Sequence, residues 1–172
     1  MQPSTSGALS ILNERLLYID TPVGPLEIKG DDQFVSGVNF REQMGISDPS
    51  PPQVLLDCAR QLEEYFAGKR LGFELPISQS GTEFQQTVWS QLCVIPYAIT
   101  ISYQQLANRI GNPKSIRAVG TTNGRNQIAI IVPCHRVIGS NGSLTGYAGG
   151  LWRKKWLLEH EHKVKHGSLT LF

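Results

Sequence analysis

The sequence predicts an α+β protein, in which a small N-terminal α/β domain precedes a mainly helical C-terminal domain. Before residue 41, three short stretches alternate apolar and polar residues between turn clusters, as the strands of a short antiparallel sheet do. Beyond residue 50, apolar residues recur at helical spacing. A Ser-Gln-Ser-Gly segment separates the two parts. We therefore place the domains at 1–77 and 78–172, with a linker around 76–82.

Composition indicates a folded protein and excludes several classes. The chain has 172 residues, of which 40% are hydrophobic and 17% charged, unlike a disordered chain. Its net charge of +2 permits a nucleic-acid partner without requiring one. Cys58, Cys93 and Cys134 are widely spaced and form no Cys-x-x-Cys pair, so we expect neither a metal site nor a disulfide framework. Without a secretory signal or a membrane-length apolar run, a soluble cytoplasmic protein is expected.

The N-terminal domain begins with strands and continues with one helix. We expect strands at 16–20, 26–29 and 34–40, with a turn cluster between the first two. Ser50-Pro51-Pro52 predicts the start of a helix that ends at Ala67, before Gly68. This helix has an apolar stripe and carries Cys58, which we expect in the core, as we do Cys93 further along. A short extended piece follows at 73–77.

Helical signals dominate after the linker. Thr82-Glu-Phe-Gln85 has the form of a capping box, and Ile95-Pro96 ends the helix that it opens. Ser102 can cap another helix, which runs to about Ile110. Gly111-Asn112-Pro113 then turns the chain into a further helix that ends near Thr122. Two short helices joined by a turn with glycine form a helix-turn-helix pattern, and a plain helical hairpin fits equally well.

The second helix of this pair has mostly small side chains. Gly120 inside it costs about 1 kcal/mol of helix stability relative to alanine. Such a surface is understandable if it must lie close to something, such as a nucleic-acid backbone. Arg117 is the one long charged side chain on it.

An apolar run at 128–132 leads to the most reactive residue of the chain. The run, Ile-Ala-Ile-Ile-Val, predicts a buried strand or extended segment that delivers Pro133-Cys134-His135-Arg136-Val137 to a pocket. A cysteine beside an imidazole is a candidate nucleophile. A small buried hydrophobe is the alternative. Neighbouring residues of an extended chain point to opposite faces, so His135 would need a water or a third residue to act on the sulfur.

The end of the chain combines a glycine-rich loop with a helix. Gly139 to Gly150 forms the loop, where backbone can approach a ligand. We expect a final helix from Leu151 to about Glu161. Its basic cluster, Arg153-Lys154-Lys155, is expected on a solvated face.

Five strings in order resemble the O6-alkylguanine-DNA alkyltransferases of the bacterial single-chain type. They are Gly81-Thr-Glu-Phe-Gln-Gln-Thr-Val-Trp89, Ser102-Tyr-Gln-Gln-Leu-Ala107, Arg117-Ala-Val-Gly120, Ile131-Val-Pro-Cys-His-Arg-Val137 and Gly146-Tyr-Ala-Gly-Gly150. The similarity covers roughly residues 14–162. It implies irreversible transfer of an alkyl group from guanine O6 in duplex DNA to a cysteine, after the nucleotide is flipped into a pocket.

The resemblance also implies roles for individual residues. Cys134 corresponds to the alkyl acceptor, and His135 would take the thiol proton through a water. Glu161 would orient or charge the imidazole, and Asn126 would brace the turn around the cysteine. Tyr103 would donate to guanine N3, which makes guanine a better leaving group.

For the substrate and the DNA, the resemblance implies two further groups of residues. Tyr147, Ala148, Gly149 and the carbonyl of Val137 would line the base pocket. The second helix of the pair would lie in the minor groove. Arg117 would fill the vacated base stack, and its neighbours Ser115, Ala118, Gly120 and Thr121 would face the DNA. Each molecule would react once, without a cofactor, as a monomer that can cooperate along DNA.

Four positions depart from the family pattern. Gln127 follows Asn126 where many relatives have proline, and Ala98 follows Pro96-Tyr97 where glycine is usual. Ile116 stands where alanine is frequent, and Ala148 replaces a serine found in some members. Two other functions stay open. An alkyltransferase-like lesion sensor would keep the helix pair but lacks the reactive cysteine, and a thiol hydrolase using Cys134 and His135 would turn over repeatedly.

Overall fold

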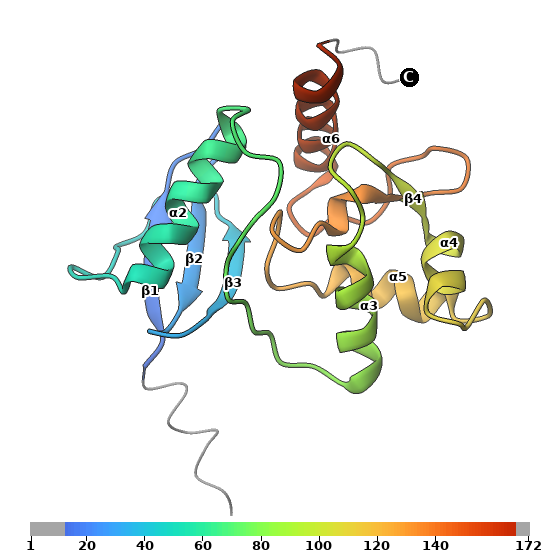
Figure 1. The fold of residues 1–172 in the computed structure, drawn as a ribbon, viewed down its shortest axis with the longest axis horizontal. Helices are drawn as coiled ribbons and strands as arrows, with labels where there is room; N and C mark the ends of the chain where they lie inside the picture. The colour runs from blue at the N-terminus through green and yellow to red at the C-terminus, as the bar shows by residue number, and fades with distance from the viewer. Residues whose placement is uncertain (1–12, 168–172) are drawn as a thin grey trace, which may run out of the picture.

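The computed structural model describes residues 13–167 and has the predicted α+β architecture. Its N-terminal half is a three-stranded antiparallel sheet in the order β1-β2-β3, formed by β1 (Arg15–Ile19), β2 (Leu26–Gly30) and β3 (Val35–Phe40). Each observed strand lies within one residue of its predicted limits. The sheet and the C-terminal helices lie side by side (Figure 1). The outer ends of the two predicted domains, residues 1–12 and 168–172, lie outside the described residues.

Helix α2 (Gln53–Phe66) covers one face of the sheet. Leu55, Cys58 and Leu62 are fully buried on the side that packs there, so the helical stripe and the core position of Cys58 are confirmed. Gly68 ends the helix with a φ of 75°, in the left-handed region that glycine adopts without strain. Burial raises the pKa of the Cys58 thiol to about 12, which makes it inert.

Strand β3 is the edge at which the two halves meet. On one side of it the extended segment at 73–77 forms no named strand, but Ile77 makes an isolated bridge to Val35. Further along, the Val38 amide donates to the Gln127 carbonyl at 2.9 Å, and the Ala129 amide donates to the Val38 carbonyl at 3.0 Å. The sheet is thereby joined by backbone hydrogen bonds to the segment that leads to Cys134.

The C-terminal half contains the predicted helices. Helix α3 (Glu83–Cys93) and helix α4 (Tyr103–Arg109) both begin with complete capping boxes, from Thr82 and Ser102. Helix α5 (Ile116–Gly124) packs against α4 and α3 and completes the helix pair. A short parallel pair, β4 (Ile101–Ser102) and β5 (Val137–Ile138), connects α4 to the cysteine segment. Cys93 is exposed, so the prediction that it packs in the core is wrong.

The predicted strand at 128–132 is also wrong. The segment is buried, but it forms successive tight turns in which the Ile131 amide donates to the Ala129 carbonyl at 2.8 Å and the Val132 amide donates to the Ile128 carbonyl at 3.0 Å. Ile130 has a φ of 71°, which is strained for a β-branched residue. The chain therefore compacts before it enters the 3₁₀ turn η1 (Cys134–Arg136). Apolar content predicted burial correctly, but it does not distinguish a strand from buried turns.

Helix α6 (Leu151–His166) is longer than predicted and stands at the top of the molecule in Figure 1. The solvated face predicted for its basic cluster is wrong for two of the three residues, because Arg153 is 5% exposed and Lys154 is fully buried, whereas Lys155 is exposed. Lys154 lies one and two helical turns before Leu157 and Glu161, on their face of the helix. Between residues 13 and 167, no helix has the length and apolar character needed to cross a membrane.

Candidate active site

A cavity of about 190 Å³ lies where the two halves of the molecule meet. Three segments line it: the end of β3 at residues 38–41, the end of α5 with the turn after it, and the loop at 147–149. Cys134 is the cysteine that lines this cavity, and it is 5% exposed. Because Cys134 is buried apart from this cavity, its thiol can react only with a group that enters the cavity.

Asn126 holds the turn around the sulfur. Its Nδ2 donates to the Val132 carbonyl at 2.8 Å and lies 3.3 Å from the Sγ of Cys134. Burial raises the pKa of the Cys134 thiol, while the Asn126 hydrogen bond and the charge of Lys154 lower it. The thiol is therefore protonated at rest, and the reaction needs a group that removes its proton.

Asn126 is itself held by Gln79 from the linker. The Gln79 Nε2 donates to the Asn126 Oδ1 at 3.1 Å, and the Gln127 amide donates to the Gln79 Oε1 at 3.0 Å. A proline at 127 has no N–H for the second bond. Gln127, where many relatives have proline, thus allows the linker residue Gln79 to hold Asn126 in place beside Cys134.

His135 is fully buried, and its Nε2 lies 2.7 Å from the Oε1 of Glu161. Burial lowers the pKa of His135, so the imidazole is neutral near pH 7. A neutral ring that donates from Nε2 leaves Nδ1 as an acceptor, and within residues 13–167 this buried Nδ1 has no hydrogen-bonding partner. His135 can therefore accept a proton at Nδ1.

Glu161 is the centre of a buried polar network. Arg136 donates to it from Nε and Nη2, at 3.0 Å and 2.9 Å, and the Tyr65 hydroxyl from α2 donates at 2.9 Å. The Ala98 amide adds a bond at 3.2 Å. Burial raises the pKa of the Glu161 carboxyl, but His135 and Arg136 outweigh this and hold it well below its usual range. The carboxylate is therefore ionised and can stabilise a positive imidazolium.

Lys154 is a site residue that the sequence interpretation missed. Its Nζ donates to the Thr145 carbonyl at 2.9 Å and lies 5.9 Å from the ring centroid of Tyr103. Burial lowers its pKa to about 8, although the charge of Cys134 counteracts the shift. The ammonium is still mostly protonated at pH 7 and favours a thiolate. Its spacing from Leu157 and Glu161 was the signal that could have identified it.

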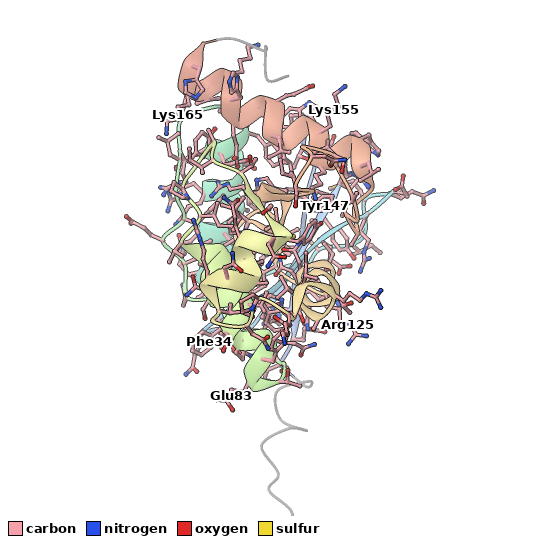
Figure 2. The ribbon with its side chains drawn as sticks, turned by 90° about the vertical axis from the view of Figure 1, so that its right-hand side faces the viewer. Phe34, Glu83, Arg125, Tyr147, Lys155 and Lys165 are labelled. Carbon is pink, nitrogen blue, oxygen red and sulfur yellow. The ribbon has the colours of Figure 1, made fainter. Side chains whose placement is uncertain are left out.

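The predicted pocket residues fall into two groups. Tyr147, Ala148 and Gly149 line the cavity, and the Tyr147 hydroxyl is buried without a partner among the described residues. In Figure 2, Tyr147 lies below α6. Val137 and Tyr103 do not border the cavity. Val137 is fully buried in β5, and the Tyr103 hydroxyl donates to the Thr145 carbonyl at 3.1 Å.

Several cavity residues have no counterpart in the sequence prediction. Asn123 and Ala129 line the cavity from α5 and the turn after it. Phe40, the last residue of β3, and Arg41, which follows it, line the cavity from the sheet. Asn123 donates to the Cys134 carbonyl at 3.3 Å, and its own Oδ1 is buried without a partner among residues 13–167. No motif marks these positions, because they reach the cavity only through the tertiary fold.

Four of the five residues predicted to face DNA lie on α5, and the fifth, Ser115, is its N-cap. Arg117, Ala118 and Thr121 are exposed on α5, and Gly120 is partly exposed. Ser115 donates to the Asn112 carbonyl at 2.6 Å and so supports the turn between the helices. At the end of the same helix, Arg125 projects outward (Figure 2). Within the described part of the chain, no group of three or more His, Cys, Asp or Glu side chains is placed to hold a metal ion.

Two family profiles match consecutive parts of the chain. Residues 15–79 match the ribonuclease-like domain of 6-O-methylguanine DNA methyltransferase, and residues 83–163 match its DNA binding domain. Together they cover nearly the whole described chain. The domain limits at residues 77 and 78 stay a prediction.

Individual proteins agree with these profiles. The chain is 47% identical over 147 residues to a methylated-DNA–protein-cysteine methyltransferase from Methanosarcina acetivorans, covering 83% of this chain and 94% of the relative. It is 46% identical over 160 residues to that of Mycobacterium bovis, covering 90% and 96%. The crystal structure of Mycobacterium tuberculosis O6-methylguanine methyltransferase superposes with a TM-score of 0.80 at 44% identity, over 92% of this chain and 99% of that one. A structure of the M. tuberculosis protein with DNA gives a TM-score of 0.78 at 45% identity, over 86% and 92%.

Proposed function

The chain belongs to the 6-O-methylguanine DNA methyltransferase family, and we propose that it repairs DNA by moving the alkyl group of O6-alkylguanine onto the sulfur of Cys134. One observation supports this acceptor above all. The Cys134 thiol borders the cavity at the junction of the two halves, beside an imidazole whose Nδ1 is free to accept a proton.

The reaction is a single displacement. The thiol proton passes to His135 Nδ1, directly or through a water, and the resulting thiolate attacks the alkyl carbon. A carbon–sulfur bond forms, and the bond from carbon to guanine O6 breaks, with its electrons left on the guanine. A proton returned to the base neutralises it, for which the Tyr103 hydroxyl is the candidate donor. The product is a thioether that water does not hydrolyse, so each molecule reacts once.

The buried network keeps His135 ready for this step. Glu161 remains ionised because Arg136 and the other donors hold its carboxylate, so it fixes the imidazole tautomer and stabilises the imidazolium. The Lys154 ammonium lowers the pKa of the thiol. The site thus generates a thiolate from its own side chains, and we propose that no cofactor takes part.

Helix α5 is the surface proposed to bind the DNA duplex from the minor groove. A Cβ added at Gly120 would lie 3.8 Å from Tyr103, which is an ordinary contact, so packing inside the protein does not require glycine there. Close approach of a DNA backbone would explain it. Arg117, exposed one turn earlier, would enter the stack in place of the flipped nucleotide. We further propose that the protein acts as a cytoplasmic monomer that can cooperate along DNA.

The function is tested by following the alkyl group. The protein is incubated with duplex DNA carrying radiolabelled O6-methylguanine, and the label is located by peptide mass spectrometry. We expect stoichiometric methylation of Cys134, its loss in Cys134→Ser, and its retention in the exposed-thiol control Cys93→Ser. Cys134→Ser should still bind DNA. Label that stays on tightly bound DNA would identify a lesion sensor, and repeated release of methanol would identify a hydrolase; either result would refute the transfer.

A further inference from the structure

We propose that the N-terminal domain forms one wall of the alkyl pocket and that Phe40 sets the size of the alkyl group accepted. This inference rests on the proposed transfer to Cys134 and assigns a direct role in it to the N-terminal domain. The same cavity that Cys134 borders is lined by residues 38–41, which form the end of β3 and the residue after it.

The backbone of β3 is in fixed register with the cysteine segment. Val38 donates to the Gln127 carbonyl at 2.9 Å and accepts from the Ala129 amide at 3.0 Å. Asn126, which braces the sulfur, directly precedes this bonded stretch. Because backbone hydrogen bonds tie the two segments together, the position of Phe40 relative to Cys134 is set by the fold and not by a mobile loop.

The Phe40 ring packs against the glycine-rich loop that forms the neighbouring part of the pocket. Its centroid lies 5.7 Å from that of Tyr147 in an edge-to-face arrangement. A Cβ added at Gly149 would come within 2.4 Å of the Phe40 Cδ2. The loop can therefore close onto the ring only because residue 149 is glycine, which supplies a structural reason for the first of the two glycines that end the Tyr-Ala-Gly-Gly string.

Arg153 holds the ring and the loop together. Its guanidinium lies 5.1 Å from the Phe40 centroid, and it donates to the Val23 carbonyl at 2.7 Å and to the Gly149 carbonyl at 3.0 Å. This side chain is 5% exposed and so connects the turn between β1 and β2, the loop and α6 inside the protein. A ring that is fixed on this side cannot move away from a bulky ligand, so its size limits the space beside the sulfur.

The test replaces Phe40 with a smaller and with a larger side chain. Phe40→Ala should enlarge the pocket and Phe40→Trp should narrow it, while Phe34→Ala removes an aromatic ring from the same domain that does not line this cavity. For each protein, the rate constants of Cys134 alkylation are measured with O6-methylguanine and O6-benzylguanine in the same duplex by intact-protein mass spectrometry. We expect the benzyl-to-methyl ratio to rise about tenfold in Phe40→Ala, to fall in Phe40→Trp and to be unchanged in Phe34→Ala.

An unchanged ratio in both Phe40 variants, with the wild-type protein alkylated normally, would overturn the inference alone. Equal loss of both rates would do the same, since it would show a purely structural role for the ring. If Phe40→Ala unfolds below the assay temperature, Phe40→Leu provides the smaller apolar side chain, and an unchanged ratio there counts equally against the proposal. Failure of the wild-type protein to label Cys134 with either substrate would instead refute the proposed function on which the inference rests.

Discussion

The core around Cys134 and the outer face of α5 differ in whether their charged side chains have partners within the protein. In the core, the Glu161 carboxylate accepts bonds from four residues that come from α2, η1 and the turn after α3. On α5, the Arg117 guanidinium has no partner within residues 13–167, and its neighbours are small. In the core, the charged groups are paired with other groups of the protein. On α5, the guanidinium is left without such a partner among the described residues.

This difference teaches how each function can be recognised. A buried charge is expensive unless it is paired, so the groups around Glu161 must already be in place before a substrate arrives. A surface that meets DNA has its partners in the complex and cannot display them in the free protein. Substitutions in the core should therefore change stability and reactivity together, whereas those on α5 should separate the two.

Loss of the Glu161 charge should have the largest effect on stability. Glu161→Gln keeps the shape of the side chain but leaves the buried Arg136 without a counter-charge. We expect the free energy of unfolding to fall by about 3 kcal/mol. Urea denaturation measures this, with Glu159→Gln as the control, because Glu159 lies on the same helix in a more exposed pair with Lys155. Equal losses in the two variants would mean that burial of the network is unimportant.

Burial of Lys154 should make the free energy of unfolding depend on pH. The pKa of Lys154, about 8 in the folded protein, lies below the value of about 10.4 in an unfolded chain. Between these values the unfolded chain binds more protons, so the free energy of unfolding should rise with pH, by up to about 3 kcal/mol. Below pH 8 the penalty for burying the ammonium is fully present.

This rise is best measured against Lys154→Met, in a Cys134→Ser background so that the thiol does not titrate. The unfolding free energies of the lysine and methionine proteins should converge or cross as the pH increases from 8 to 10.4. The adjacent Lys155→Met, at an exposed position, should run parallel to the parent protein throughout. A parallel curve for Lys154→Met would contradict the buried charge.

On α5, Arg117→Ala should separate function from stability. We expect the unfolding free energy to change by no more than about 0.5 kcal/mol, since the side chain is exposed and its guanidinium has no hydrogen-bond or ion-pair partner within residues 13–167. The alkyl-transfer rate on duplex DNA should fall about tenfold, and affinity for undamaged DNA should fall less, because a side chain that fills the base stack acts on the flipped state. Arg125→Ala, at the end of the same helix, is the matched control. A similar loss of rate in both variants would indicate a general charge effect.

Gly120→Ala should increase stability and slow alkyl transfer. Alanine fits the helix and makes only ordinary contact with Tyr103, so stability should increase by about 0.5–1 kcal/mol. The added methyl group faces the proposed DNA surface, so transfer from duplex DNA should slow. Thermal unfolding and single-turnover rates give the two values. A more stable variant with an unchanged rate would show that the DNA does not approach α5 at this point.

How much the sequence could predict follows the same division. The strands, the capping boxes of α3 and α4 and the family were predictable, because alternation, capping residues and ordered motifs are local in the chain. The solvated face expected for Arg153 and Lys154 was wrong, because a charge count ignores which side of a helix faces the core. Phe40 and Asn123 were beyond reach, since their distance from Cys134 is decided only when the two halves pack.

The smallest change is expected at Ala98, in the turn after α3, where the sequence departs from the family pattern. Ala98 has a φ of 60°, where a side chain is strained and glycine is not. Its amide donates to Glu161, so the network holds the residue in this conformation. Ala98→Gly should therefore raise the free energy of unfolding by roughly 0.5–1 kcal/mol, net of the greater freedom of glycine in the unfolded chain. Ala118→Gly, inside α5, should instead lower it by about 1 kcal/mol. A loss in both variants would show that the turn relaxes at no cost, and that the core around Glu161 does not impose the strain.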